Sequence, residues 1–211
     1  MTKVLFGILL SYLLGSIPTG FLMARLWKRI DIRTVGSGNI GATNTFRALG
    51  KIPGITVLIL DVGKGVVAPF VIANLLGLTD AGSRVLLGLA VVVGHIWTVF
   101  LKFKGGKGVA TSIGVLLGLS ICITSVRSVA LLTVASWILV FLISGYVSLA
   151  SLVAALLLPI ALVSTNQDVA LVFLGIVFCS VIYIRHLQNI KRLFSHQEPR
   201  VQILSKRKRF P

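Results

Sequence analysis

Charged side chains are scarce in this sequence, and acidic ones are the scarcest. Only 12% of its 211 residues are charged, against about 25% in a typical soluble domain. The chain has only 5 Asp and Glu residues, compared with 21 Lys and Arg residues. The two cysteines, Cys122 and Cys179, lie in apolar stretches and show neither a disulfide framework nor metal-ligand spacing. This shortage disfavours a serine–histidine–acid triad and metal catalysis, so we expect no metal and no cofactor.

Apolar residues, by contrast, make up 56% of the chain. In a soluble protein the net charge of +16 would suggest nucleic-acid binding. Long apolar runs and the absence of a nucleic-acid motif favour a membrane protein instead, with membrane lipids or anionic substrates as partners. The first apolar run is followed by Arg25, Trp27, Lys28 and Arg29 rather than by a small-residue cleavage site. We therefore expect a retained first span.

Apolar runs long enough to cross a bilayer recur along the chain, since about 20 helical residues suffice. The stretch from Ser128 to Gln167 has no charge and is long enough for about two crossings, with a turn expected near Ser144-Gly145-Tyr146. We predict an all-α integral membrane protein, a bundle of seven transmembrane helices in one domain over residues 1–211, with a basic tail from about residue 186 to 211. The other expected spans are Val4–Leu26, Ile52–Leu78, Val85–Leu101, Val109–Val126 and Val169–Ile184.

The basic residues also predict an orientation. With the C-terminus in the cytoplasm, every Lys and Arg lies on the cytoplasmic side except Lys3, Arg84, Arg127 and the midspan Lys64. Both glycine-rich loops, the turn near Ser144 and the tail then share that face, and the N-terminus lies outside. We expect the inner membrane of a bacterium, and interpret the run from Lys206 to Arg209 as a lipid-headgroup anchor.

Two polar, glycine-rich segments interrupt the apolar runs. The first glycine loop (residues 35–44) contains Gly36-Ser-Gly-Asn-Ile-Gly-Ala-Thr-Asn44, with Arg47 on the helical face of Thr43 and Asn44. The second glycine loop (residues 103–112) contains Lys104-Gly-Gly-Lys-Gly-Val-Ala-Thr111. Glycines let backbone N–H groups converge on an anion at a helix N-terminus. An ordinary capped turn and a basic juxtamembrane loop are the simpler alternatives. The second loop is not a P-loop, because Gly108 follows Lys107.

Other polar groups lie inside or beside the spans. Asp61 and Lys64 form either a self-neutralising pair or a pair that faces a polar cavity, where Lys64 could reach a substrate. His95 is either a packing residue or part of a site. His186, Asn189 and Arg192 share helical spacing at the end of the last span. The His-x4-acid spacing of many thioester-using glycerolipid acyltransferases is absent, since Phe100 and Lys191 occupy the acid's place.

In these blocks the sequence resembles the bacterial acyl-phosphate:glycerol-3-phosphate acyltransferase family. The resemblance extends from Gly15-Ser-Ile-Pro18 through both glycine loops to His186-x-x-Asn189-Ile-x-Arg192 and Glu198. It implies a seven-helix inner-membrane enzyme that transfers an acyl chain from acyl phosphate to the sn-1 hydroxyl of glycerol 3-phosphate. The products would be lysophosphatidic acid and phosphate, in the first step of phospholipid biosynthesis. Thr98 and His196 depart from the family, which often has proline and usually glycine at these places.

The resemblance and the chemistry together suggest roles. Acyl phosphate carries a good leaving group, so positioning and positive charge suffice and no acyl-enzyme is expected. Lys104, His186 and Asn189 are the candidate catalytic residues, with His186 the first candidate for a general base, His95 the second, and a substrate phosphate the alternative. The candidate substrate-binding residues are Ser37, Asn39, Thr43, Asn44, Arg47, Lys64, His95, Gly105, Gly106, Lys107, Gly108, Thr111, Ser144, Gly145, Arg192 and Glu198.

Two other functions remain open from the sequence. A small transporter for phosphate or an organic anion could use the same loops, although transporters commonly place broken helices at the midplane. A structural protein that only binds lipid is the other alternative, but it would not explain the two polar loops. The oligomeric state and the acyl-chain preference are not predicted.

Overall fold

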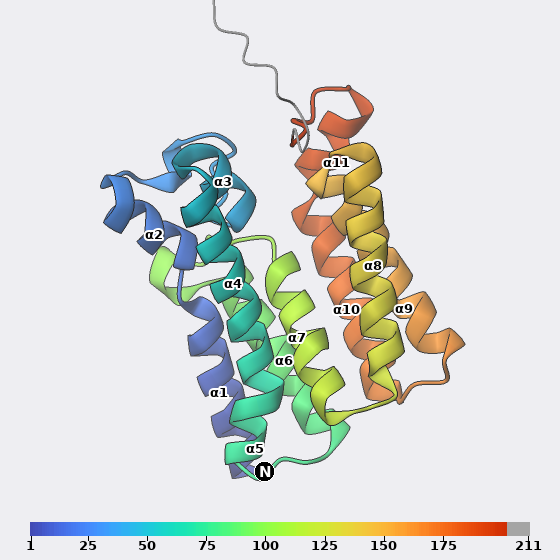
Figure 1. Ribbon diagram of the computed structural model, residues 1–211. Helices are drawn as coiled ribbons and strands as arrows, with labels where there is room; N and C mark the ends of the chain where they lie inside the picture. The colour runs from blue at the N-terminus through green and yellow to red at the C-terminus, as the bar shows by residue number, and fades with distance from the viewer. Residues whose placement is uncertain (202–211) are drawn as a thin grey trace, which may run out of the picture.

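The computed structural model describes residues 1–201, and within this range the chain forms helices and no strand (Figure 1). The predicted all-α membrane architecture is thus confirmed. The run Lys206–Arg209 lies outside the described residues. The helices are α1 (Thr2–Ser16), α2 (Thr19–Lys28), η1 (Ile32–Thr34), α3 (Ala42–Leu49), α4 (Lys51–Val67), η2 (Ala68–Ile72), α5 (Ala73–Leu75), α6 (Ala81–Ile96), η3 (Val99–Leu101), α7 (Val109–Cys122), α8 (Val126–Ser144), α9 (Val147–Ser164), α10 (Val169–Arg185) and α11 (Leu187–Phe194).

Among residues 1–201, five helical segments are long and apolar enough to cross a membrane, and six if α10 and α11, bent by 60°, count as one span. Each corresponds to an expected span. The remaining expected span is α7, whose 14 residues give about 21 Å of helix and fall short of the usual length. It nevertheless packs between α4 and α8 within the bundle (Figure 1). The predicted count of seven therefore holds only approximately.

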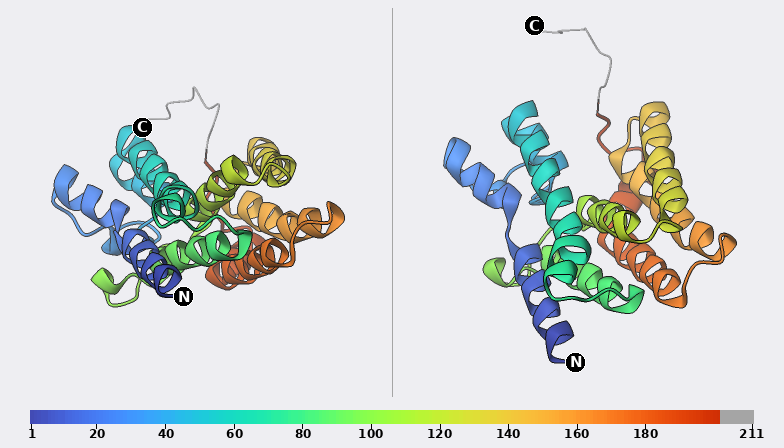
Figure 2. Two further views of the ribbon diagram at one scale, coloured as in Figure 1. Left: turned by 90° about the horizontal axis from the view of Figure 1, so that it is seen from below. Right: turned by 60° about the horizontal axis from the view of Figure 1, so that its bottom comes forward.

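The span boundaries agree with the sequence prediction to within a few residues. The first span covers Thr2–Lys28, and it bends where α1 ends and α2 begins, at Ile17 and Pro18 (Figures 1 and 2). Pro18 lacks a backbone N–H, so helical hydrogen bonding cannot continue through it. The third span continues from α6, which ends at Ile96, through the short η3 to Leu101, the predicted end. The predicted turn between α8 and α9 is confirmed at Gly145, which has φ 73°.

Small residues allow the helices of the first half to approach closely. α1 packs along α6, and a Cβ on Gly15 would overlap the backbone of Val91, while one on Gly94 would overlap that of Tyr12. Close approach through small residues is typical of helices that associate in lipid. The large core cluster joins α6, α7, α9 and α10 through side chains such as Val115, Leu162 and Phe178. Many outward-facing Leu and Ile side chains are exposed, as expected for surfaces that contact lipid.

Candidate active site at the loop end of the bundle

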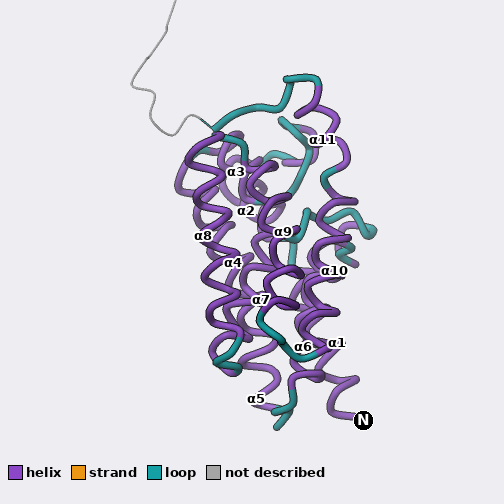
Figure 3. Tube along the Cα trace, turned by 90° about the vertical axis from the view of Figure 1, so that its right-hand side faces the viewer, coloured by secondary structure: helices purple, strands orange, loops and turns teal. Residues whose placement is uncertain are grey.

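The polar connections gather at the end of the bundle opposite the N-terminus (Figures 1 and 3). Arg47 of α3 donates to the Pro199 carbonyl, 3.1 Å away, and Arg185 of α10 donates to the Gly105 carbonyl at 3.2 Å. Val201 donates to the Gly145 carbonyl at 2.9 Å. These contacts unite both glycine loops, the α8–α9 turn and the C-terminal segment at one face, as the sequence predicts.

Asn44 gives the first glycine loop its shape. Its side-chain nitrogen donates to the carbonyls of Val35 and Asn39, both at 2.9 Å, and its Oδ1 accepts the backbone N–H of Ser37 at 3.0 Å. The side chain of Asn39 in turn accepts the N–H of Gly41. Asn44 is buried, so its side chain shapes the loop and does not face solvent, whereas the Ser37 side chain is exposed and Thr43 is half-buried.

The second glycine loop folds back over the end of α6. Gly105 and Gly106 donate their N–H groups to the carbonyls of Ile96 and His95, each at 3.0 Å. Gly108, with φ 86°, then starts α7. The hydroxyls of Thr111 and Ser112 are buried and have no hydrogen-bond partner within residues 1–201. A helix N-terminus with unpaired N–H groups and hydroxyls favours an anion, so this loop is suited to phosphate.

A hydrogen-bonded network links the second loop to the C-terminal segment. Lys107 donates to Asn189 Oδ1, and Asn189 Nδ2 donates to Glu198 Oε1 at 2.6 Å. Arg192 Nε lies 2.9 Å from Glu198 Oε2. Burial would raise the pKa of Glu198, but the hydrogen bonds from Asn189 and Arg192 outweigh it and the pKa is lowered. Glu198 is thus a carboxylate that fixes Asn189 and Arg192.

Lys107 itself stays cationic at neutral pH. Burial lowers its pKa to about 8, and the nearby Arg192, Arg185 and Arg47 act in the same direction, while Glu198 opposes them. Because the excess of positive charge is held in place by the fold, an anionic ligand is the natural counter-ion here. Within residues 1–201, no three His, Cys, Asp or Glu side chains gather as metal ligands would.

His186 lies directly beyond α10, and its ring is 2% exposed. Its Nδ1 is 2.7 Å from the carbonyl of Ile182, which can only accept, so Nδ1 carries the proton. Burial lowers the pKa of His186 to about 4, and the charge of Lys107 adds to the effect. The imidazole is therefore neutral at pH 7 and its Nε2 keeps a lone pair, as a general base or a hydroxyl acceptor requires.

Ser144 and Gly145 hold the C-terminal segment. The Ser144 hydroxyl donates to the Val140 carbonyl at 2.6 Å and accepts the N–H of Tyr146 at 3.1 Å. Arg200 stacks over the Tyr146 ring, 4.8 Å from its centroid. The predicted binding residues of this turn are thus occupied within the protein.

Lys64 and His95 are not at this surface. Both are buried below the loops, where Lys64 pairs with Asp61, and His95 supports Gly106 from beneath. A Cβ on Gly106 would overlap Nε2 of His95. Because the loop covers this edge of the ring, His95 is badly placed to act as a general base.

The sequence motifs did not identify Arg185 as a residue of the site. Arg185 donates to Gly105, and its Nε is buried without a partner among the described residues. Its position beside His186 at the end of a span could have indicated it.

The structure also shows what Thr98 and His196 do, the two departures from the family. Thr98 replaces a frequent proline and donates to the Ser16 carbonyl. His196 adopts φ 59°, the left-handed conformation that glycine would take more cheaply, and the turn closes through Gln197 N–H to the Arg192 carbonyl.

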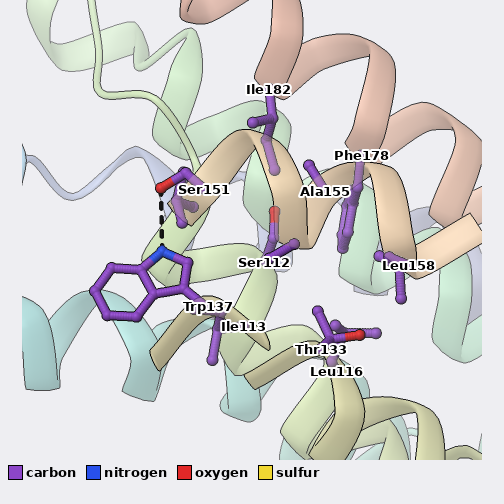
Figure 4. Close-up of a pocket in the computed structure, with 12 residues that line it drawn as sticks. Ser112, Ile113, Leu116, Thr133, Trp137, Ser151, Ala155, Leu158, Phe178 and Ile182 are labelled. Carbon is purple, nitrogen blue, oxygen red and sulfur yellow. Dashed lines mark hydrogen bonds between the residues drawn. The ribbon is translucent and has the colours of Figure 1, made fainter. Parts of the chain in front are cut away.

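An apolar pocket lies between α7, α8, α9 and α10 (Figure 4). It begins at Val109, the residue after Gly108, and includes Ile182, whose carbonyl holds His186. Trp137 closes one side by donating to the Ser151 hydroxyl at 3.1 Å. The other lining residues are Ser112, Ile113, Leu116, Thr133, Ala154, Ala155, Leu158 and Phe178. The second glycine loop and an apolar pocket therefore adjoin.

Known proteins are similar to this chain in sequence and in fold. A family model described as glycerol-3-phosphate acyltransferase matches residues 5–196. The glycerol-3-phosphate acyltransferase of Carboxydothermus hydrogenoformans is 42% identical over 198 residues, covering 94% of this chain and 96% of that relative. The enzyme of the same name from Aquifex aeolicus is 43% identical over 198 residues, covering 94% and 99%.

Two crystal structures of PlsY (YgiH), an integral membrane glycerol 3-phosphate acyltransferase, are also similar. The glycerol 3-phosphate form has a TM-score of 0.86 and 43% identity, and covers 94% of this chain and 96% of that one. The lysophosphatidic acid form has a TM-score of 0.83 and 42% identity, covering 94% and 95%. This chain therefore belongs to the glycerol-3-phosphate acyltransferase family and is an integral membrane acyltransferase.

Proposed function

We propose that the protein transfers an acyl chain from acyl phosphate to the sn-1 hydroxyl of glycerol 3-phosphate, giving lysophosphatidic acid and phosphate. The observation that carries the proposal is the junction of the second glycine loop with the apolar pocket at Gly108 and Val109. A ligand that joins a phosphate to an acyl chain through one carbonyl suits such a junction. The related structures in glycerol 3-phosphate and lysophosphatidic acid forms support the acceptor and the product.

In the proposed reaction the sn-1 oxygen attacks the acyl carbonyl carbon. The bond between that carbon and the phosphate oxygen breaks, the electron pair leaves with phosphate, and the hydroxyl proton passes to Nε2 of His186 or to a phosphate oxygen. Lys104 and the backbone N–H groups of Lys107 and Gly108 would neutralise one phosphate, because those of Gly105 and Gly106 already bond the carbonyls of Ile96 and His95. The first loop, through Ser37, Thr43 and Arg47, would bind the other.

The remaining predicted residues would complete the acceptor site. His186 and Asn189 would orient glycerol 3-phosphate, with Lys107, Arg192 and Glu198 fixing Asn189 through the network described above. The buried hydroxyl of Thr111, which has no hydrogen-bond partner within residues 1–201, would bind the phosphate held by the second glycine loop. Bringing the attacking oxygen to about 3–3.5 Å from the carbonyl can supply much of the rate enhancement, which suits a site without an activated protein nucleophile.

The proposed location is the inner membrane of a bacterium, with the loop end in the cytoplasm and the N-terminus outside. The excess of Lys and Arg at the loop end supports this orientation, since cytoplasmic segments are generally richer in them. Both loops lie at one end of the bundle, which argues against a transport path between them.

Purified protein with acyl phosphate and glycerol 3-phosphate, without nucleotide, is expected to release lysophosphatidic acid and phosphate in equal amounts. The matched reaction supplies the same acyl chain as a coenzyme A thioester and is expected to give no product. Mass spectrometry of the lipid and a phosphate assay measure both. Product from the thioester, or none from acyl phosphate, would overturn the proposed donor.

The pocket predicts a selective effect on chain length. The pocket now encloses only about 20 Å³, so in the proposed complex an acyl chain would enter by widening it; Ala155 is buried there, and Ala155→Phe should then exclude part of a long chain. Excluding about three methylenes costs about 2.4 kcal/mol, or roughly 50-fold in kcat/KM for a palmitoyl donor. Activity with a short-chain acyl phosphate should change little, and it reports that the variant is folded. Leu156→Phe, on the exposed side of the same helix, is the control. Equal losses with both donors would place the acyl chain elsewhere.

A further inference from the structure

The buried pair Asp61 and Lys64 does more than neutralise itself. Lys64 Nζ lies 2.9 Å from Asp61 Oδ1, and their side chains are only 4% and 1% exposed. Lys64 also donates to the carbonyls of Gly15 and Ile17, at 3.1 and 3.3 Å. The Gly15 carbonyl lost its helical partner at the Pro18 break, because Thr19 N–H bonds Ile17 instead. Lys64 therefore stabilises the break where α1 gives way to α2.

Asp61 contacts the support of the first glycine loop through Thr19. The Thr19 hydroxyl donates to Asp61 Oδ1 at 2.6 Å. The next residue, Gly20, lies flat against the Ile40 carbonyl, where a Cβ would overlap the oxygen. Ile40 belongs to the first glycine loop and is itself buried. The position of Thr19 thus sets the surface on which this loop rests.

The same carboxylate oxygen also faces the support of the second glycine loop. His95 Nδ1 lies 3.6 Å from Asp61 Oδ1. Gly106 donates its N–H to the His95 carbonyl and packs against the other edge of the ring. Lys107, which binds Asn189, is the next residue. Asp61 on α4 therefore accepts a hydrogen bond from Thr19 and lies beside His95, so it contacts the supports of both loops.

We propose that Asp61 is a positioning residue that fixes the two glycine loops relative to each other. The proposal rests on the proposed function in one respect, that each loop holds one of the two reacting molecules. Each substrate is then bound by its own loop, while the distance between the attacking oxygen and the carbonyl depends on Asp61. A misplacement of about 1 Å can cost about 100-fold in rate. Loss of the brace should therefore lower kcat and leave both KM values nearly unchanged.

A purely stabilising ion pair predicts a different outcome. Replacing a buried pair by uncharged groups of similar shape is often neutral or stabilising, and breaking it lowers the stability of the whole fold. Neither effect separates kcat from KM. The separation is therefore the measurement that distinguishes positioning from stability.

The test uses Thr19→Val and Asp61→Asn, both close in shape to the original residue. Each is expected to lower kcat, Asp61→Asn by about 100-fold, with KM for both substrates within about 2-fold of wild type. Thr19→Ser keeps the hydroxyl and should restore kcat. Thr56→Val is the matched control, because the Thr56 hydroxyl bonds only Ile52 of its own helix α4. Wild-type kcat in Thr19→Val, or parallel changes in kcat and KM, would overturn the proposal.

A second measurement separates this proposal from the proposed reaction. Spin labels at Thr34→Cys and Phe103→Cys, both exposed, flank the two loops in a background without Cys122 and Cys179. Asp61→Asn and Thr19→Val should broaden or shift the distance between the labels, and Thr56→Val should not. An unchanged distance would refute the brace even if the reaction is right. If wild type makes no lysophosphatidic acid from acyl phosphate, the proposed function fails while the distance still tests the brace.

Discussion

Lys104→Ala is expected to lower kcat/KM about 10²–10³-fold while leaving the thermal unfolding of the protein unchanged. The Lys104 side chain is exposed and has no hydrogen bond to other residues in the range 1–201, so its removal breaks no contact of the fold. The expected loss is that of one cationic group that stabilises charge developing on the leaving phosphate. Incorporation of labelled glycerol 3-phosphate into lipid at several concentrations of each substrate measures the effect.

Lys102→Ala is the control for Lys104. Lys102 is also exposed and lies two residues earlier, before the loop turns back over α6. It carries the same charge into the same region, so a general effect of surface potential would appear in both variants. We expect Lys102→Ala to remain within about 2-fold of wild type, because long-range effects of exposed charges are screened by salt. Near-normal activity in Lys104→Ala would remove the phosphate role from Lys104.

Lys107 cannot provide so clean a test. Its ammonium group binds Asn189 and lies near Glu198, so a substitution there changes both the charge and the network that fixes the C-terminal segment. This difference between two lysines of one loop is not visible in the sequence, where both precede a glycine. It follows from the way the loop folds back on His95 and Ile96.

The sequence predicts the architecture well because each membrane span requires a long apolar run, which is visible in the sequence itself. Runs without charge predicted the helices and the turn at Gly145, and the clustering of cations predicted a common face for the loops. Boundaries set by tertiary contacts were less accessible. The bend at Pro18 was expected, but the contact that stabilises it was not, because Lys64, on another helix, donates to the carbonyls of Gly15 and Ile17.

The site was predictable by residue type more than by role. The motifs contain Asn44, Ser144 and His95, but their side chains have structural roles. Asn44 shapes the first glycine loop, Ser144 shapes the α8–α9 turn, and His95 packs beneath Gly106. Hydrogen bonds between residues far apart in the chain, such as Arg185 to Gly105, leave no local pattern. Helical periodicity describes one helix at a time, so it cannot show which side chains a neighbouring helix will occupy.

His186→Gln is expected to lower kcat about 10²–10⁴-fold, the contribution of a positioned general base. The bond from Nδ1 to the Ile182 carbonyl fixes the neutral imidazole, and Ile182 itself lines the apolar pocket. Glutamine approximates the length of the ring and can hydrogen-bond a hydroxyl, but its amide cannot accept the proton. Gln188→Ala, exposed on the adjoining helix α11, is the control and should retain wild-type kcat.

The pH dependence identifies which group takes the proton. Because the pKa of His186 is about 4, Nε2 is free above that pH and becomes protonated as the pH falls through it. Activity that depends on His186 should therefore decline only near pH 4, and that limb of the kcat/KM profile should vanish in His186→Gln. If a substrate phosphate is the base, the limb lies near its second pKa of about 6 and persists in the variant. His186→Gln would then cost less than about 10-fold, and the role of His186 would reduce to orienting the hydroxyl.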